Sequence, residues 1–241
     1  MKIGILIIHG MGDHSIGYSK PFQNLILEKY QGKNEIIFQE TLWNNVIKEK
    51  EQFLFKSISS NLAYDDIRNF MIYSIGDVIA YQNTNSQDDS YHRINADIYN
   101  NYLELRNKLS DNDIIIFVAH SLGGVILNNF IYDHQDKNPV KFSCLFTLGT
   151  PLALFSLKYK SLDLPIKLSD DQKWLNLYDK DDVLAYPITE LSDKYIEHNT
   201  NGKIFDIEVN VGNILQSWNP LSHTAYWKDS DVIHYILREI P

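Results

Sequence analysis

The segment Ile114-Ile115-Ile116-Phe117-Val118-Ala119-His120-Ser121-Leu122-Gly123-Gly124 decides the fold of this chain. Its first six residues are apolar without alternation, which is typical of a central strand in a parallel sheet. A helical pattern, Leu122–Asp133, begins directly after Ser121. A sharp strand-to-helix turn at Ser121 would raise its hydroxyl above the carboxyl ends of the strands. The residues two positions away, Ala119 and Gly123, are small enough for that turn.

A turn of this kind is typical of a nucleophilic serine. The pattern small-x-Ser-x-small also arises by chance, but here the strand before it and the helix after it supply the context that a nucleophile needs. The first N–H groups of that helix point toward the site and favour developing negative charge. We therefore predict Ser121 as the catalytic nucleophile and the N–H of Leu122 as one donor to an oxyanion.

A glycine-rich loop, His9-Gly10-Met11-Gly12-Asp13, follows the first predicted strand. Its glycines let the backbone approach a ligand closely, and a His-Gly step after an early strand can place a second oxyanion donor. We predict that this donor is the N–H of Met11. The loop lacks the full three-glycine spacing of a dinucleotide-binding loop, and we expect His9 to shape the loop rather than to act as a base.

Strands alternate with helices along the chain, which predicts an α/β fold of about six mostly parallel strands with helices on both faces. We expect a single domain over residues 1–241. The region 41–90 fits the alternation less well, because it contains two amphipathic helical patterns. It is either an enlarged crossover between early strands or a helical cap over the active site. Outside the opening segment, the expected strands are Lys2–Ile8, Glu35–Gln39, Ser143–Leu148, Trp174–Tyr178 and Phe205–Val211, and the expected helices are Phe22–Tyr30, Trp43–Phe55, Ile67–Tyr81, Tyr91–Leu109 and Asp229–Arg238.

Three aspartates, Asp179, Asp181 and Asp182, follow the predicted strand Trp174–Tyr178. A carboxylate on the loop after this strand suits a triad in the order Ser, acid, His. We predict Asp182 as the acid, because a carboxylate followed by Val183-Leu184 and a later proline resembles the acid loop of many hydrolases. Asp181 is the alternative acid, and at least one of the three is a solvated loop charge.

The chain has eight histidines, and topology selects one of them as the base. Five precede the acid loop, His198 precedes the last predicted strand, and His234 lies within the last predicted helix. His223 follows that strand and precedes that helix, which is where the base belongs in this order of residues. We predict that His223 takes the serine proton and returns it to the leaving group, while the acid holds its tautomer.

These motifs resemble the α/β-hydrolase superfamily, particularly its lipase- and esterase-like members with a His-Gly-x-Gly oxyanion loop. The resemblance implies an α/β-hydrolase fold and cleavage of a carboxylic ester through an acyl-serine intermediate, without a cofactor. Members also cleave thioesters or transfer acyl groups, so a thioesterase, an acyltransferase and a non-catalytic scaffold are the alternatives. The chain departs from the common pattern at Ala119, where glycine is usual, and by opening on the oxyanion strand. The matching stretches are His9–Gly12, Ala119–Gly124, Leu148–Pro151, Asn176–Asp182 and Ser222–Trp227.

The composition limits the partners and the location that we expect. With 241 residues, 44% of them hydrophobic, the chain can bury one large core. Lys and Arg total 22 against 31 for Asp and Glu, and the net charge of −9 argues against a nucleic-acid partner. The single cysteine excludes an intrachain disulfide, and no stretch is long and apolar enough for a transmembrane segment. We expect a cytoplasmic enzyme with no metal site and with a small ester or lipid-like substrate, in an oligomeric state that the sequence leaves open.

Overall fold

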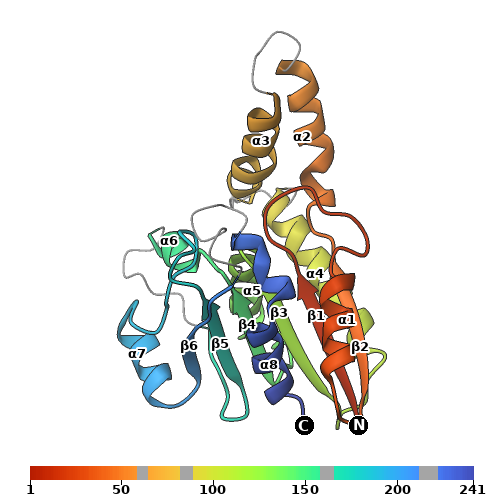
Figure 1. Cartoon of the computed structure of the whole chain (residues 1–241), viewed down its shortest axis with the longest axis vertical. Helices are drawn as coiled ribbons and strands as arrows, with labels where there is room; N and C mark the ends of the chain where they lie inside the picture. Colours follow the sequence, from red (N-terminus) through yellow and green to blue (C-terminus); the bar gives the residue numbers. More distant parts are fainter. Residues whose placement is uncertain (59–64, 82–88, 158–165, 212–221) are drawn as a thin grey trace.

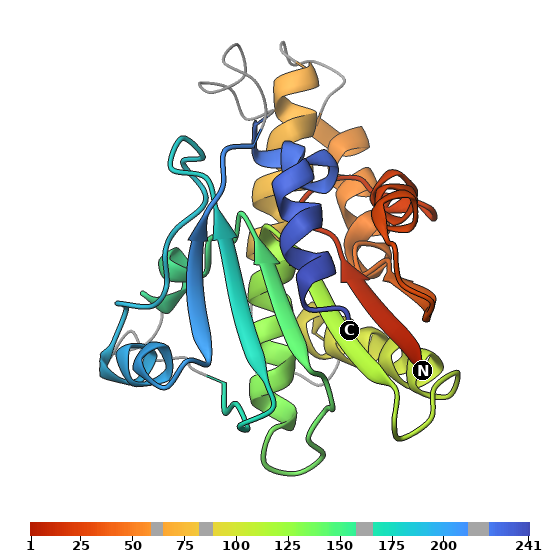
Figure 2. The ribbon, with the colours of Figure 1, turned by 60° about the horizontal axis from the view of Figure 1, so that its bottom comes forward.

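The core of the protein is a six-stranded parallel sheet with helices on both faces (Figures 1 and 2). The computed structural model of the chain describes residues 1–58, 65–81, 89–157, 166–211 and 222–241. Every pair of neighbouring strands is parallel, in the order β2-β1-β3-β4-β5-β6. The strands are β1 (Lys2–Ile8), β2 (Glu35–Thr41), β3 (Ile114–His120), β4 (Cys144–Leu148), β5 (Lys173–Tyr178) and β6 (Ile204–Glu208).

The apolar strand β3 lies in the middle of the sheet, between β1 and β4. Ile116 pairs with Ile5 on one side and with Cys144 on the other. A strand that is covered on both faces has no solvent side, which explains why β3 lacks alternation. Because all strands are parallel, the loops that follow β1, β3 and β5 leave the same edge of the sheet. The predicted α/β class with six parallel strands is confirmed.

Two hydrophobic cores hold the helices against the sheet. On β1, Leu6 and Ile8 face the core beneath α4 (Ser90–Arg106) and α5 (Leu122–His134). Ile3, Ile5 and Ile7 face the opposite core beneath α1 (Lys20–Lys29) and α8 (Ser230–Arg238). All five β1 side chains are fully buried, and burying each of them stabilises the fold by about 1.5–3 kcal/mol.

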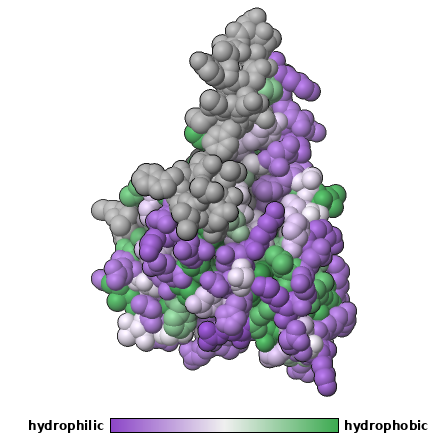
Figure 3. All heavy atoms as spheres, viewed as in Figure 1, coloured by the Kyte–Doolittle hydropathy of each residue, from purple (hydrophilic) through white to green (hydrophobic). Residues whose placement is uncertain are grey.

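The segment between β2 and β3 contains two further helices, α2 (Asn45–Ile58) and α3 (Asp65–Ala80), ahead of α4. These two helices lie side by side and extend beyond the carboxyl edge of the sheet, whereas α4 packs on β1 and β2 (Figure 1). Hydrophilic residues gather along the α2 side of the pair (Figure 3). The predicted helical insertion between early strands is therefore present. Residues 59–64 and 82–88 of the predicted 41–90 segment lie outside the described residues.

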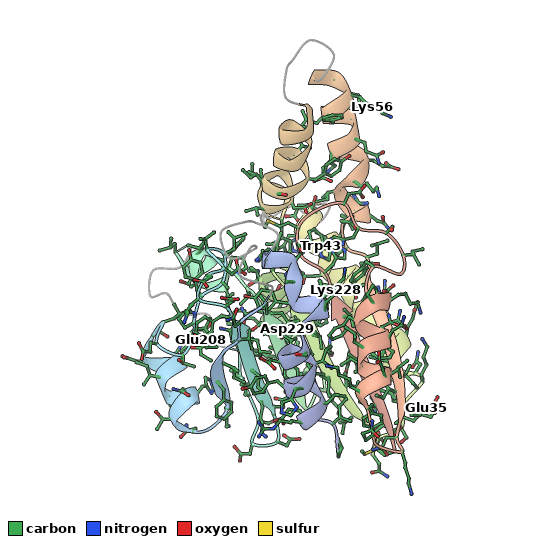
Figure 4. All side chains as sticks on the ribbon, in the orientation of Figure 1. Glu35, Trp43, Lys56, Glu208, Lys228 and Asp229 are labelled. Atoms are coloured by element: carbon green, nitrogen blue, oxygen red, sulfur yellow. The ribbon has the colours of Figure 1, made fainter. Side chains whose placement is uncertain are left out.

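Trp43 anchors the base of α2 to the loop after β1. In Figure 4 it lies at the foot of the helical pair, whereas Lys56 lies near the far end of α2. The Trp43 side chain is fully buried, and its Nε1–H donates to the His9 carbonyl at 2.8 Å. Its ring stacks on the His9 ring at a centroid distance of 4.9 Å. Trp43 is thus a core residue.

The structure differs from the sequence-based expectation at the second half of the chain. Strand β6 ends at Glu208, three residues before the predicted end, because Val209 and Val211 are buried beyond the last paired residue and prolong the apolar pattern. Three short elements were not predicted: α6 (Leu152–Ser156), α7 (Asp193–Thr200) and the 3₁₀ helix η2 (Ser222–Lys228). Short helices give too few turns for a clear periodicity. Within the described ranges, no helix has the length and apolarity that a membrane crossing requires.

Candidate active site

Ser121 occupies the sharp turn between β3 and α5. Its backbone has φ 54° and ψ −129°, and it is the one non-glycine residue with a positive φ in the described part of the chain. Such a conformation costs on the order of 1–3 kcal/mol and is found mainly at functional sites. Two backbone hydrogen bonds of 2.9 Å hold the turn, from Ser121 N–H to the Leu148 carbonyl and from Gly124 N–H to the Ser121 carbonyl.

The structure brings three of the predicted site residues into one hydrogen-bonded chain. The Ser121 hydroxyl donates to Nε2 of His223 at 2.6 Å. Nδ1 of His223 donates to Oδ2 of Asp182 at 2.7 Å. Because a carboxylate can only accept, Nδ1 carries the imidazole proton and Nε2 is left as the acceptor for the hydroxyl. All three residues are buried, so this arrangement can activate the serine oxygen for attack.

The carboxylate of Asp182 is fixed at both of its oxygens. Oδ1 accepts from the Leu184 backbone N–H at 3.0 Å, and Oδ2 accepts from His223 and from the Tyr226 hydroxyl at 3.1 Å. The side chain is 2% exposed. A carboxylate with this many donors is held in one orientation, which in turn fixes the imidazole of His223.

The neighbouring aspartates have other partners. Asp181 is exposed, and its backbone N–H donates to Oδ1 of Asp179 at 2.8 Å. Asp179 is buried, and its Oδ2 accepts from the Val211 backbone N–H at 2.7 Å. The alternative acid is therefore an exposed side chain, and Asp179 ties the acid loop to the segment that follows β6.

Sequence reasoning missed Tyr226, which links these groups. Its hydroxyl accepts the Asp179 backbone N–H at 2.9 Å and donates to Oδ2 of Asp182. Burial, together with the charge of Asp182, raises the pKa of Tyr226 well above its ordinary value, so the hydroxyl keeps its proton and acts as a donor. The only sequence signal was its place three residues after His223, which is not a recognisable motif by itself.

We expect Tyr226→Phe to lower kcat by about tenfold, because Asp182 loses one of its donors while the ring still fills the core. The substitution also leaves the buried Asp179 N–H without an acceptor, at a cost of about 1–3 kcal/mol in unfolding free energy. Tyr102→Phe is the matched control, since the Tyr102 hydroxyl accepts the Lys141 N–H at 2.9 Å far from Ser121. Equal kcat in the two variants, measured on one ester, would remove Tyr226 from the site.

His120 supports the backbone of His223. Its Nε2 lies 2.5 Å from the His223 carbonyl oxygen, and because a carbonyl only accepts, Nε2 must carry the proton. Burial and the neighbouring His223 hold the pKa of His120 well below its ordinary value, so this ring stays neutral. The two rings are in contact, with centroids 4.9 Å apart. His120 therefore holds the backbone of His223 through a neutral ring.

The loop after β1 lies directly against the turn at Ser121. A Cβ added to Gly10 would come within 2.5 Å of the Ser121 Cβ, and one added to Gly123 would come within 2.3 Å of the His9 carbonyl oxygen. Only glycine permits this approach of the two segments. Met11 follows Gly10 on this loop, and Leu122 follows Ser121 on the turn, so the two predicted oxyanion donors belong to segments in contact.

His9 is buried and plays a structural part in this loop. Its Nδ1–H donates to the Gly10 carbonyl at 2.8 Å, and its ring lies between those of Trp43 and His14. Burial and the neighbouring His14 hold the pKa of His9 well below its ordinary value. These contacts agree with the expectation that His9 shapes the loop.

No group of three or more His, Cys, Asp or Glu side chains that could hold a metal ion occurs among the described residues. A cavity of about 780 Å³ lies far from Ser121, at the amino ends of β3 and β4, where Asp113, Ile115 and Ser143 line it. Ser121, His223 and Asp182 do not line this cavity, so its size does not make it the active site. The hydrogen-bonded group of these three residues lies at the opposite, carboxyl edge of the sheet.

No family model matches the chain, and no curated protein matches it by sequence. Solved structures with a similar overall arrangement include ClbQ from the colibactin NRPS/PKS pathway, at 10% identity and a TM-score of 0.46, with 100% of this chain and 97% of that chain covered. A cutinase-like protein from Cryptococcus sp. has 11% identity and a TM-score of 0.47, with 99% and 92% covered. An acetyl xylan esterase has 11% identity and a TM-score of 0.45, with 99% and 98% covered. These likenesses are distant, and the function of the chain has to rest on its own site.

Proposed function

We propose that the protein is a serine hydrolase that cleaves a carboxylic ester through an acyl-serine intermediate. The observation that carries this proposal is the hydrogen-bonded chain from Ser121 through His223 to Asp182, on a strained turn of a kind that clusters at functional sites. Ser121 is the nucleophile, His223 the general base and Asp182 the orienting acid. The N–H groups of Met11 and Leu122 are the oxyanion donors.

The reaction follows from the direction of these hydrogen bonds. His223 Nε2 takes the proton of the Ser121 hydroxyl as the oxygen attacks the ester carbonyl, and Asp182 stabilises the imidazolium that forms. The two backbone donors stabilise the tetrahedral oxyanion, each by about 3–4 kcal/mol in comparable sites. The imidazolium then protonates the leaving alcohol, and the same base activates water to release the acid from Ser121.

A thioester would react through the same steps, with a thiol as leaving group, and an acyltransferase would use an alcohol or thiol in place of water. A non-catalytic scaffold is the alternative of a different class. It is disfavoured because a binding scaffold has no use for a strained serine whose hydroxyl is hydrogen-bonded to an imidazole. The fold of lipase- and esterase-like α/β-hydrolases accommodates all of these residues in their observed places, which supports the enzyme.

Labelling with a fluorescent serine-reactive phosphonate tests the proposal. We expect stoichiometric labelling of the native protein and none after heat denaturation, because only the folded site activates the hydroxyl. A panel of esters and thioesters of graded acyl length, with and without an added alcohol, then separates hydrolysis from transfer. A native protein that neither reacts with the phosphonate nor cleaves any member of the panel would leave the scaffold as the better explanation.

The projecting pair α2–α3 bears on the choice of acyl chain. We propose that this pair caps the site, since it rises from the carboxyl edge of the sheet where Ser121 lies (Figure 1). Phe53 of α2 is 74% exposed and is available to a ligand, whereas Trp43 is buried beneath the pair. Substituting the exposed Phe53 and the buried Trp43 in parallel therefore distinguishes a side chain that contacts the acyl chain from one that only packs in the core.

We expect Trp43→Ala to lower the unfolding free energy by about 3–5 kcal/mol and to reduce turnover by the same factor for short and long acyl esters. Phe53→Ala is the matched control and should change stability by about 0.5 kcal/mol or less, because the ring is exposed. Thermal melts and rates on C2 and C12 esters measure both effects. A loss confined to the C12 ester in Trp43→Ala, at unchanged melting temperature, would place Trp43 in the acyl pocket.

A further inference from the structure

The loop after β1 is held by residues of the projecting helical pair and its base. The backbone N–H of Gly12 donates to Oδ2 of Asp77 on α3 at 2.8 Å. Asn44, directly before α2, donates from Nδ2 to the His14 carbonyl at 3.2 Å and to the Gly12 carbonyl at 3.5 Å. Lys48 of α2 pairs with Asp13 at 2.6 Å. The loop therefore takes its shape from α2 and α3 as well as from β1.

The bond to Gly12 is placed where it controls the peptide beside Met11. Gly12 has φ +108°, a conformation that side chains rarely adopt, although a Cβ there would meet nothing within 4 Å. Glycine is therefore required at position 12 because of the positive φ, and not because a side chain would collide with a neighbour. Because the peptide bond is planar, fixing the Gly12 N–H also fixes the Met11 carbonyl. Only the two backbone dihedrals of Met11 then separate this anchored plane from the Met11 N–H.

Asp77 is well suited to hold one position, because it is 1% exposed and faces a second carboxyl group, Glu51 of α2. Two carboxyls buried beside each other can share one proton, while Oδ2 of Asp77 accepts from the Gly12 N–H. Burial, and to a lesser degree Glu51 and Asp13, raise the pKa of Asp77 to about 8 against the opposing effect of the Gly12 hydrogen bond. Burial also raises the pKa of Glu51.

We propose that Asp77 is a positioning residue, which fixes the Gly12 backbone from helix α3 and thereby aims the Met11 N–H at the oxyanion. This inference rests on the proposed function for its catalytic consequence, but the anchoring of the loop is a separate property. The proposal makes the projecting pair part of the catalytic geometry, since α3 would have to stay seated for the oxyanion donor to be aligned.

The test compares substitutions that keep or remove the acceptor. Asp77→Asn retains an oxygen for the Gly12 N–H and should keep kcat within about threefold of wild type, while Asp77→Leu should lower kcat by about 10–100-fold with KM unchanged. Asp77→Ala gives the same comparison if the leucine does not fold. Ile79→Ala, an exposed position on the same helix, is the control and should behave as wild type.

Hydrogen exchange of the 9–14 backbone supplies a readout that does not depend on turnover. We expect exchange at least about tenfold faster in Asp77→Leu than in wild type, with Asp77→Asn close to wild type. Wild-type exchange in Asp77→Leu would overturn the proposal, and so would wild-type kcat in that variant. If the wild-type protein proves inactive and unlabelled, the proposed hydrolase is lost, and the exchange rates alone still decide whether Asp77 anchors the loop.

The pH dependence of the unfolding free energy gives a second test, which uses only wild type and the conservative variant Asp77→Asn. Because the folded state holds a proton on Asp77 that the unfolded chain releases near pH 4, wild type should lose stability as pH rises from about 4 to about 8. Asp77→Asn should remove that part of the slope. The other groups facing Asp77 and Glu51 are Lys48, Tyr73 and Asp13; they are present in both proteins, so the difference between the two curves reports the Asp77 carboxyl together with its effect on Glu51 and Asp13. Parallel melting-temperature curves would mean that Asp77 is not engaged and would overturn the proposal.

Discussion

Ser121→Ala is expected to lower kcat/KM for the best ester substrate by about 10⁴–10⁶, because the alanine methyl cannot form the acyl intermediate. The residual activity of the variant should come from direct attack of water on the bound ester, assisted by the oxyanion donors. The measurement is initial-rate hydrolysis with purified wild type and variant, and phosphonate labelling of both. The expected labelling of the variant is zero. Activity within tenfold of wild type would remove Ser121 from the mechanism.

A second substitution at the same position separates loss of chemistry from loss of structure. Ser121 adopts φ 54°, which alanine tolerates no better than serine, whereas glycine adopts it freely. Ser121→Gly should therefore be as inactive as Ser121→Ala, but its unfolding free energy should be higher by the released strain, about 1–3 kcal/mol, and its melting temperature should rise accordingly. An inactive protein that is more stable than wild type cannot owe its inactivity to misfolding. A Ser121→Gly variant less stable than Ser121→Ala would argue against stored strain at the turn.

Local patterns were enough to predict the sheet and the turn at Ser121. A strand buried on both faces must be apolar throughout, and a turn of this sharpness needs small neighbours. Both features can therefore be recognised within one short stretch of sequence, Ile114–Gly124. The choice of His223 followed from strand order alone, and the structure places its ring between Ser121 and Asp182.

Residues that act across long sequence distances were beyond such reasoning. Tyr226 reaches Asp182 and Asp179, and Asp77 reaches Gly12, only after the chain has folded. In the sequence, Tyr226 is one more aromatic residue near a helix, and Asp77 is one polar residue among several in an amphipathic helix. A buried carboxyl in such a helix costs free energy unless it is paired, and that cost was the one signal that could have singled out Asp77.

The sequence predicts Asp182 as the acid with the adjacent Asp181 as the alternative, and the two side chains differ in their surroundings in the structure. In an extended loop, neighbouring side chains would point in different directions; the structure has turns here instead, with the Asp182 N–H donating to the Asp179 carbonyl at 3.1 Å. Here Asp182 turns inward to His223, and Asp181 is exposed. A second carboxylate beside the same ring would also have raised a carboxyl pKa by like-charge repulsion.

Asp182→Asn should lower turnover by about 10⁴, because the amide can present a donor to Nδ1 and so favour the wrong tautomer of His223. Asp181→Asn is the matched control one residue away, and it should cost at most about tenfold, since an exposed loop charge contributes little to the site.

Asp179→Asn completes the set and separates rate from stability. Its amide nitrogen would face the backbone N–H of either Val211 or Asp181, so one buried bond is lost at a cost of about 1–3 kcal/mol in unfolding free energy. Its rate should fall much less than that of Asp182→Asn. Rates and thermal melts of the three variants, measured side by side, decide the assignment. A large rate loss at Asp181 with little at Asp182 would move the acid by one residue, and it would require the acid loop to adopt a different conformation during catalysis.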